Sequence, residues 1–136
     1  MHKSFLKTAA LLGAFSVGMG AFAAHTLKEL VSEYAMGIFE TAVRYQFYHV
    51  FALLAVGILY QQFGGAMLKW AGRLFILGII LFSGSLYALA VVKGAVLPGF
   101  KWLGPITPLG GVCFIGGWIC LFIALLKKDS KTITTK

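Results

Sequence analysis

Charged residues are scarce in this sequence. They make up 12% of its 136 residues, whereas 60% of the residues are hydrophobic, and a typical soluble domain contains about 25% charged residues. The few charges also avoid four long apolar runs and gather at the ends of those runs. This is expected because a charge at the centre of a membrane-spanning helix costs about 2.5–3.5 kcal/mol. The composition therefore excludes a soluble globular protein and predicts bilayer-spanning helices.

Acidic residues are the rarest charged group, since 4 Asp and Glu stand against 12 Lys and Arg, for a net charge of +8. The basic residues are scattered at the ends of the apolar runs and do not form one continuous basic face, so nucleic acid is not a predicted partner. The predicted partner is the lipid bilayer.

Cysteine is nearly absent, and catalytic motifs are absent. The two cysteines, Cys113 and Cys120, lie in one apolar run. Their spacing separates them by about 10 Å on a helix, beyond the limit of about 7 Å for a disulfide, so both are predicted to be free thiols.

The sequence has no P-loop, dinucleotide-binding fingerprint, zinc motif or nucleophile elbow. It gives no support to an enzymatic activity, and no cofactor is predicted.

Four apolar segments are long enough to cross a bilayer, which takes about 20 helical residues. The predicted spans are residues 5–24, 42–62, 74–92 and 108–126. They form one domain, residues 1–136, and the predicted fold is an all-α integral membrane four-helix bundle. Residues 27–39 have an amphipathic helical pattern, which predicts a short interfacial helix between spans one and two. An ordinary surface cap over the bundle is the alternative for this segment.

The first span has a second interpretation as a cleaved signal peptide, because a basic start and an apolar core precede Ala21-Phe22-Ala23. A stripe of small residues on one helical face favours a retained span, since it lets helix backbones approach closely. The stripe consists of Gly13, Ser16, Gly20 and Ala24. Further close-packing positions are predicted at Gly84, Gly110 and Gly117. Gly84 lies between two serines, and this triplet also predicts a kink.

The second span contains the candidate functional residues. Its fully apolar part, residues 50–60, is too short to cross a bilayer and must be extended by residues 42–49. This extension brings polar side chains into the outer part of the bilayer, where they need protein partners. The predicted polar cluster consists of Glu40, Arg44, Tyr45, Gln46, Tyr48 and His49, together with His25 just after span one.

Glu40 and Arg44 are four residues apart, a spacing that predicts an ion pair fixing the depth of span two. A proton or substrate pathway is the alternative role for this pair. His49 is the deepest ionisable residue and is predicted to be neutral and hydrogen-bonded. Its alternatives are a proton relay or the ligation of a metal or haem, with His25 as a second ligand. Two histidines without a carboxylate or thiolate at ligand spacing are a weak metal pattern, so no metal site is predicted.

Four local strings occur in a specific order and spacing. They read GAFAAH at 20–25, ETAVRYQFYH at 40–49, SGSLY at 83–87 and GPITPLGG at 104–111. Together they resemble the YgdD-like family of uncharacterised small membrane proteins, also catalogued as domain of unknown function 423 and similar to animal transmembrane protein 256. One departure is Ala23, where the family usually has a second glycine, which implies looser packing. The resemblance implies a retained first span and a bacterial inner-membrane location, and it brings no established activity.

The predicted function is that of a non-enzymatic, multi-pass protein of the bacterial plasma (inner) membrane. Its outer-leaflet polar cluster would contact a partner protein, a lipid or a solute, and a homo-oligomer is an expected assembly. One alternative is a small transporter or proton-linked channel, which would need several chains because four helices enclose little space. Another is a haem- or metal-binding redox protein that uses His49 and His25.

The distribution of basic residues predicts the topology. Eight basic residues lie on one side of the spans, at positions 3, 7, 69, 73, 127, 128, 131 and 136, against four on the other side, at 28, 44, 93 and 101. The richer side is cytoplasmic by the positive-inside rule, so both termini face the cytoplasm. A reporter fused after Lys136 should be active only if it functions in the cytoplasm, and one inserted at 93–101 only if it functions outside. The opposite pattern of activities would reject this topology.

Overall fold

The computed structural model describes residues 1–94 and 103–126, and every regular element within these ranges is helical. The elements are α1 (Lys3–His25), the 3₁₀ helix η1 (Leu27–Glu29), α2 (Glu33–Leu59), α3 (Gly65–Gly78), the π-helix η2 (Ile79–Ser83), α4 (Gly84–Gly94) and α5 (Ile106–Leu126). Because α3, η2 and α4 follow one another without a break, they form one continuous rod.

Four of the helical segments are long and apolar enough to cross a membrane: Lys3–Glu29, Glu33–Leu59, Gly65–Gly94 and Ile106–Leu126. At a rise of about 1.5 Å per residue, even the shortest reaches the thickness of a bilayer's hydrocarbon core, about 30 Å. The predicted all-α four-helix fold is confirmed. It arises because a helix satisfies its own backbone hydrogen bonds, which a chain surrounded by lipid requires.

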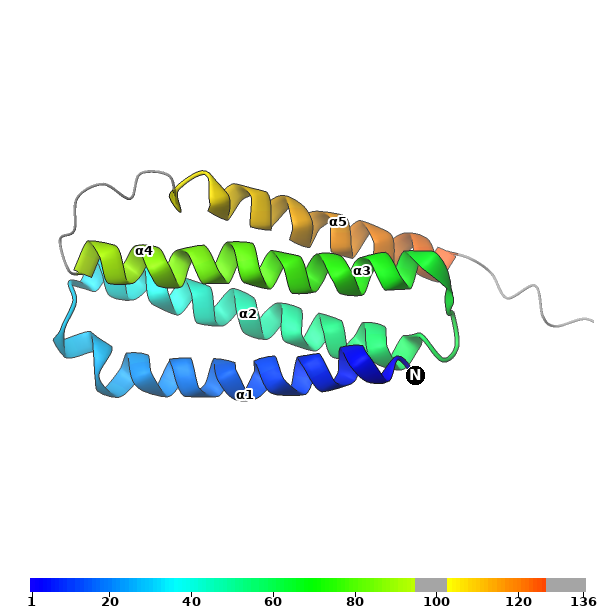
Figure 1. The fold of residues 1–136 in the computed structure, drawn as a ribbon, viewed down its shortest axis with the longest axis horizontal. Coiled ribbons are helices and arrows are strands. Elements are labelled where there is room, and N and C mark those ends of the chain that lie inside the picture. Colours follow the sequence, from blue (N-terminus) through cyan, green and yellow to red (C-terminus); the bar gives the residue numbers. More distant parts are fainter. Residues whose placement is uncertain (95–102, 127–136) are drawn as a thin grey trace, which may run out of the picture.

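The helices run alternately up and down, with α1 and α5 along opposite edges of the bundle (Figure 1). Helix α1 packs on α2, α2 packs on the rod, and α5 packs on α3 and η2. Gly64, which precedes α3, and Gly65, its first residue, have φ values of 49° and 89°, which glycine adopts without steric cost. The N-terminus, the turn between α2 and α3 and the end of α5 lie at the same end of the bundle (Figure 1).

The core contains two buried clusters. The larger one joins all four long segments and includes Phe5, Leu53, Phe75, Phe114 and Leu121. The smaller one lies toward the other end, where Ala23, Leu27, Phe39 and Ala90 are buried together. In a bilayer these contacts stabilise the bundle through close packing, because lipid chains are as apolar as the side chains themselves.

The predicted interfacial helix is wrong in its extent. Only Leu27–Glu29 forms a separate helix, a single 3₁₀ turn, and α2 already begins at Glu33. The cause is the N-cap of α2: Ser32 has extended backbone angles, and its hydroxyl accepts a hydrogen bond from the N–H of Ala35 at 3.3 Å. The second half of the amphipathic segment is therefore the first part of α2, which also starts well before the predicted span at 42–62.

The irregularity predicted around Gly84 lies one turn earlier, as the π-helix Ile79–Ser83. Two predicted small positions pack tightly against this rod. A Cβ atom added at Gly110 would meet the backbone N and Cα atoms of Phe82, and one added at Gly117 would lie 2.6 Å from the ring of Phe75. Helix α5 therefore approaches the rod along its glycines.

The small-residue stripe of α1 packs against α2 through part of its length. Ser16 is fully buried. Cβ atoms added at Gly13 and Gly20 would make ordinary contacts of 3.5 Å with Val50 and 3.8 Å with Val43. These positions line the interface without forcing the two backbones together.

Ala24 and Gly84 are wrong as packing positions. Ala24 is exposed, whereas its neighbour Ala23 is buried. The buried small residues of α1 are Ala9, Ser16 and Ala23, which recur every seven residues, and one residue farther turns the side chain by about 100°. Gly84 is exposed, and no described atom lies within 4 Å of a Cβ added there.

This contrast generates a paired test. Gly110→Ala should lower the free energy of unfolding by about 1–3 kcal/mol, because the new methyl group overpacks against the backbone of Phe82. Gly84→Ala adds the same methyl group at an open helical position, with φ −60° and ψ −45°, and should leave stability unchanged or raise it by about 0.5–1 kcal/mol. Thermal unfolding in one detergent measures both variants. Equal destabilisation by the two would contradict the described packing.

Candidate functional site

Gln46 connects three helices from the centre of the bundle. Its side chain is only 1% exposed. The amide nitrogen donates to the carbonyl of Leu12 in α1 at 3.2 Å, and the amide oxygen accepts from the hydroxyl of Tyr87 in α4 at 3.0 Å. Because an unpaired amide in an apolar interior costs several kcal/mol, these bonds fix the rotation of α2 between its neighbours.

His49 is also buried, with 5% of its surface exposed. Its Nδ1 atom lies 2.7 Å from the carbonyl oxygen of Tyr45, and its Nε2 atom accepts the indole N–H of Trp118 in α5 at 3.3 Å. A carbonyl only accepts and an indole only donates, so both bonds require a neutral ring with its proton on Nδ1. The ring also stacks on Phe114, with 3.4 Å between ring centres.

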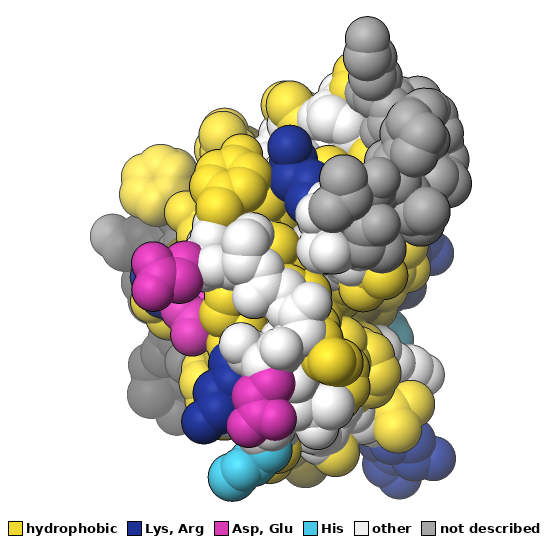
Figure 2. Space-filling view, turned by 90° about the vertical axis from the view of Figure 1, so that its left-hand side faces the viewer, with side chains coloured by type: hydrophobic (Ala, Val, Ile, Leu, Met, Phe, Trp, Pro, Cys, Tyr) yellow, Lys and Arg dark blue, Asp and Glu magenta, His cyan; other side chains and the backbone are white. Residues whose placement is uncertain are grey.

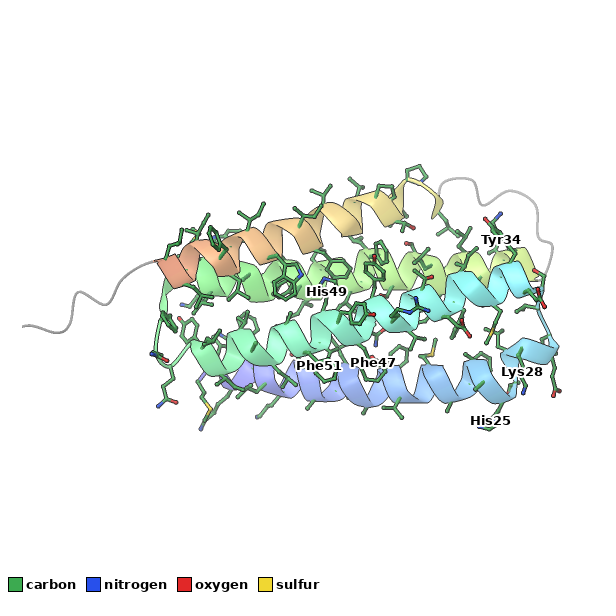
Figure 3. The ribbon with its side chains drawn as sticks, turned by 180° about the vertical axis from the view of Figure 1, so that it is seen from behind. His25, Lys28, Tyr34, Phe47, His49 and Phe51 are labelled. Atoms are coloured by element: carbon green, nitrogen blue, oxygen red, sulfur yellow. The ribbon has the colours of Figure 1, made fainter. Side chains whose placement is uncertain are left out.

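These bonds leave neither ring nitrogen of His49 available to a metal or haem. His25, the proposed second ligand, is exposed at the end of α1, whereas His49 lies midway along α2 (Figure 3). The structure does not bring the two histidines together. Within residues 1–94 and 103–126, no group of three or more His, Cys, Asp or Glu side chains is placed to hold a metal ion.

Serine hydroxyls add two further links between helices. Ser83 of η2 donates to the carbonyl of Ala42 in α2 at 2.9 Å, and Ser85 of α4 lies 2.7 Å from the hydroxyl of Thr107 in α5. Over the part of the chain that the structure describes, no buried side-chain nitrogen or oxygen lacks a hydrogen-bond partner. The interior polar groups therefore hold the bundle together.

A groove opens beside His49, between α2, η2 and α5. We call it the aromatic groove; its cavity volume is about 570 Å³, and it is lined by Tyr45, Tyr48, His49, Phe82, Gly111, Phe114, Ile115 and Trp118. Its rings contact one another, with centroids of Tyr45 and Phe82 4.7 Å apart and those of Phe82 and Phe114 5.5 Å apart. Exposed rim residues such as Tyr48 and Ile115 leave the groove open to the outside of the bundle. In a bilayer, the outside is lipid.

Sequence reasoning identified the α2 side of this groove and missed the α5 side. Tyr45, Tyr48 and His49 belong to the predicted polar cluster, whereas Phe114 and Trp118 lie in a uniformly apolar segment. An indole N–H within a membrane-spanning segment was the available signal, because it needs an acceptor when buried.

The predicted ion pair between Glu40 and Arg44 does not form. Among the described residues, no Glu and Arg or Lys side chains lie within the 4.0 Å limit of an ion pair. Both side chains are exposed on one face of α2, where solvent or headgroup contact competes with a surface pair. Beside them is a hollow of about 260 Å³, which we call the headgroup hollow, lined by Gly20, Ala23, Glu40, Val43 and Arg44.

Charged side chains gather at the end of the bundle that contains η1 and the start of α2 (Figure 2). Lys28, Glu29, Glu33 and Glu40 line a shallow depression there. Lys93 from the end of α4 lies over the ring of Tyr34, 5.3 Å from its centroid. This end is predicted to lie outside the cell.

Comparisons with known proteins agree with this architecture. A family model described as "Protein of unknown function (DUF423)" matches residues 19–111. A UPF0382 membrane protein of Staphylococcus aureus (strain bovine RF122) is 46% identical over 92% of this chain and 97% of its own length. The UPF0382 membrane protein YwdK of Bacillus subtilis is 39% identical over 92% of this chain and 98% of its own length. No solved structure matches the chain.

The Gln46 bonds can be tested by a double-mutant cycle. Gln46→Met keeps the size of the side chain but leaves the hydroxyl of Tyr87 unpaired, and it should cost about 1 kcal/mol of stability. Tyr87→Phe should reduce the cost of Gln46→Met, so the double variant loses less than the sum of the single variants. Tyr48→Phe is the matched control on α2, and its effect should simply add to that of Gln46→Met. Additive effects in both cycles would refute the bond.

Proposed function

The chain belongs to the family described as protein of unknown function DUF423 and is a bacterial membrane protein. From this premise we propose that it is a non-catalytic, multi-pass protein of the plasma membrane that holds the acyl chain of a lipid in the aromatic groove. The observation that supports this proposal is an apolar, outward-opening groove beside a histidine whose hydrogen-bonding capacity is used inside the protein.

The groove suits a hydrocarbon chain in both size and chemistry. Its volume of about 570 Å³ lies within the range of about 300–1,000 Å³ that is typical of ligand sites. Rings and aliphatic carbons make up most of its wall, and a flexible acyl chain gains dispersion contacts against such a surface. A bilayer supplies acyl chains directly at the mouth of the groove, so entry requires no transfer through water.

The geometry of His49 favours lipid binding over proton transport. A proton relay must accept a proton on one ring nitrogen and release it from another along a polar path. In this protein, protonation of Nε2 would place an N–H against the indole N–H of Trp118 and break their bond. The alternative of a proton-linked channel therefore gains no support from the residue that prompted it.

In the proposed topology, the four spans form one membrane domain with both termini in the cytoplasm. The N-terminus, the turn between α2 and α3 and the end of α5 share one end of the bundle (Figure 1). Lys3, Lys7, Lys69 and Arg73 lie near this end, and four more lysines follow the end of α5 in the sequence, which supports a cytoplasmic location. Arg44 then belongs to the outer half of the membrane, and the aromatic groove lies near its centre, because its lining residues His49 and Phe114 lie near the middle of α2 and α5.

Lipid occupancy can be measured through Trp118, because bromine atoms on an acyl chain quench tryptophan fluorescence on contact. A variant with Trp70→Phe and Trp102→Phe keeps Trp118 alone, and in nanodiscs it should be quenched by brominated phosphatidylcholine. Gly111→Leu places a side chain in the groove and should lower this quenching by about half or more, since the site is filled. Thermal unfolding confirms that each variant is folded.

Two controls separate the groove from general lipid contact. Val112→Leu enlarges an exposed neighbour on α5 outside the groove and should leave the quenching of Trp118 unchanged. A variant with Trp70 as its sole tryptophan reports on an exposed position of α3 that does not line the groove, and it should not respond to Gly111→Leu. If Gly111→Leu leaves the quenching of Trp118 unchanged, the groove holds no chain and the proposal fails.

A further inference from the structure

We propose that the lipid bound at the aromatic groove is a phosphoethanolamine lipid, with its phosphate held by Arg44 and its ammonium group by Glu40. This inference rests on the proposed function and adds the class of headgroup. It comes from the charges on the exposed face of α2, which the hydrogen-bonded interior does not use.

Arg44 does not line the aromatic groove, but its neighbours on α2 do. It immediately precedes Tyr45 and is one helical turn from Tyr48, and both tyrosines line the groove. Side chains on a helix tilt toward its N-terminus, which in α2 is the end away from the groove. From a position one turn outside Tyr48, the Arg44 side chain is therefore directed toward the headgroup layer, where a lipid with its chain in the groove has its phosphate.

Glu40 lies four residues, or about 6 Å, farther toward the membrane surface on the same face. From the bilayer centre outward, the protein thus presents a cation and then an anion. A phosphoethanolamine lipid presents the complementary order, because its phosphate is attached next to the acyl chains and its ammonium group lies farther out. A guanidinium binds phosphate through paired N–H donors, and a carboxylate accepts hydrogen bonds from a primary ammonium.

The headgroup hollow supplies space next to these two charges. Its volume is about 260 Å³, and the small residues Gly20 and Ala23 of α1 form its wall opposite Glu40 and Arg44. Neither charged side chain is committed to an ion pair within residues 1–94 and 103–126. Both charges are therefore available to a ligand that bears one group of each sign.

The headgroup order also distinguishes three lipid classes. An anionic phosphatidylglycerol would satisfy Arg44 but bring its net negative charge toward Glu40. A phosphatidylcholine has the right charge order, but its quaternary ammonium has no N–H to donate to the carboxylate. A phosphatidylethanolamine satisfies both residues. The expected selectivity is about five-fold over either of the other classes, the factor that one charged contact at a membrane surface contributes.

The test uses the full chain with Trp118 as its sole tryptophan, in nanodiscs that contain a trace of one brominated lipid in unbrominated phosphatidylcholine. Brominated phosphatidylethanolamine, phosphatidylglycerol and phosphatidylcholine are compared at equal mole fractions. The ethanolamine lipid should half-saturate the groove-dependent quenching at about one-fifth of the mole fraction that the others need. Groove-dependent quenching is the part removed by Gly111→Leu.

Two variants determine which charge selects the headgroup. Glu40→Gln should abolish the preference for the ethanolamine lipid, because Glu40 distinguishes the three headgroups. Arg44→Gln should weaken the groove-dependent quenching by all three lipids, because each of them contains the phosphate that Arg44 binds. Arg73→Gln, an exposed arginine at the opposite end of the bundle, and Glu33→Gln, an exposed glutamate farther out on α2, are the matched controls and should preserve both the preference and the quenching.

The remaining outcomes distinguish a failure of the headgroup assignment from a failure of the proposed function. Equal groove-dependent quenching by the three lipids, or a preference for the glycerol lipid that Glu40→Gln strengthens, would overturn the headgroup assignment and leave lipid binding intact. A complete lack of groove-dependent quenching with all three lipids would overturn the proposed function itself.

Discussion

The structure depends on satisfying polar groups in an interior that water does not reach. Helix α2 contains several of these polar groups. Gln46 bonds to α1 and α4, and His49 bonds to α5. The carbonyl of Ala42 accepts a hydrogen bond from η2, and the carbonyl of Tyr45 bonds to the ring of His49. Lipid chains compete well for the apolar faces of helices, so apolar burial alone specifies little about how membrane helices are rotated. A buried amide is more selective, since only one rotation of α2 gives Gln46 both Leu12 and Tyr87.

Glycine determines how closely the helices come together around these bonds. Gly110 allows α5 to meet the backbone of Phe82, and Gly78 admits the ring of Phe114. This approach is what allows Phe114 to stack on His49 and Trp118 to reach it. The π-helix before Gly84 contributes a change of helical phase, after which Ser85 bonds to Thr107 of α5. The aromatic groove thus results from the same contacts that hold α5 in place.

The sequence predicts the parts of this arrangement that local physics controls. The lengths of the apolar runs predicted the four helices. Because polar groups exposed to lipid are costly, the sequence also predicted that Gln46 and His49 need protein partners. Their partners were not predictable, because Tyr87 and Trp118 are 41 and 69 residues away, and no local pattern encodes such contacts. At the end of α1 the predicted stripe is one residue out of register, because Ala23 is buried and Ala24 is exposed, and alanine fits both the buried and the exposed face. The start of α2 at Glu33 could have been predicted from Ser32, because serine is a favourable N-cap residue. The amphipathic pattern of residues 27–39 instead predicted one helix that continues through this position.

The interior bonds also decide what the protein presents to the membrane. Neighbouring residues on an α-helix differ by about 100°, so fixing Gln46 toward the core directs Arg44, two residues earlier, to nearly the opposite side. Glu40 and Tyr48 lie four residues on either side of Arg44 and share its face. A rotation of α2 by one residue would remove Gln46 and His49 from their partners and would move this row of charges away from the aromatic groove. Interior polar residues and the exterior charged face therefore constrain one another, although they never touch, because both belong to a single rigid helix.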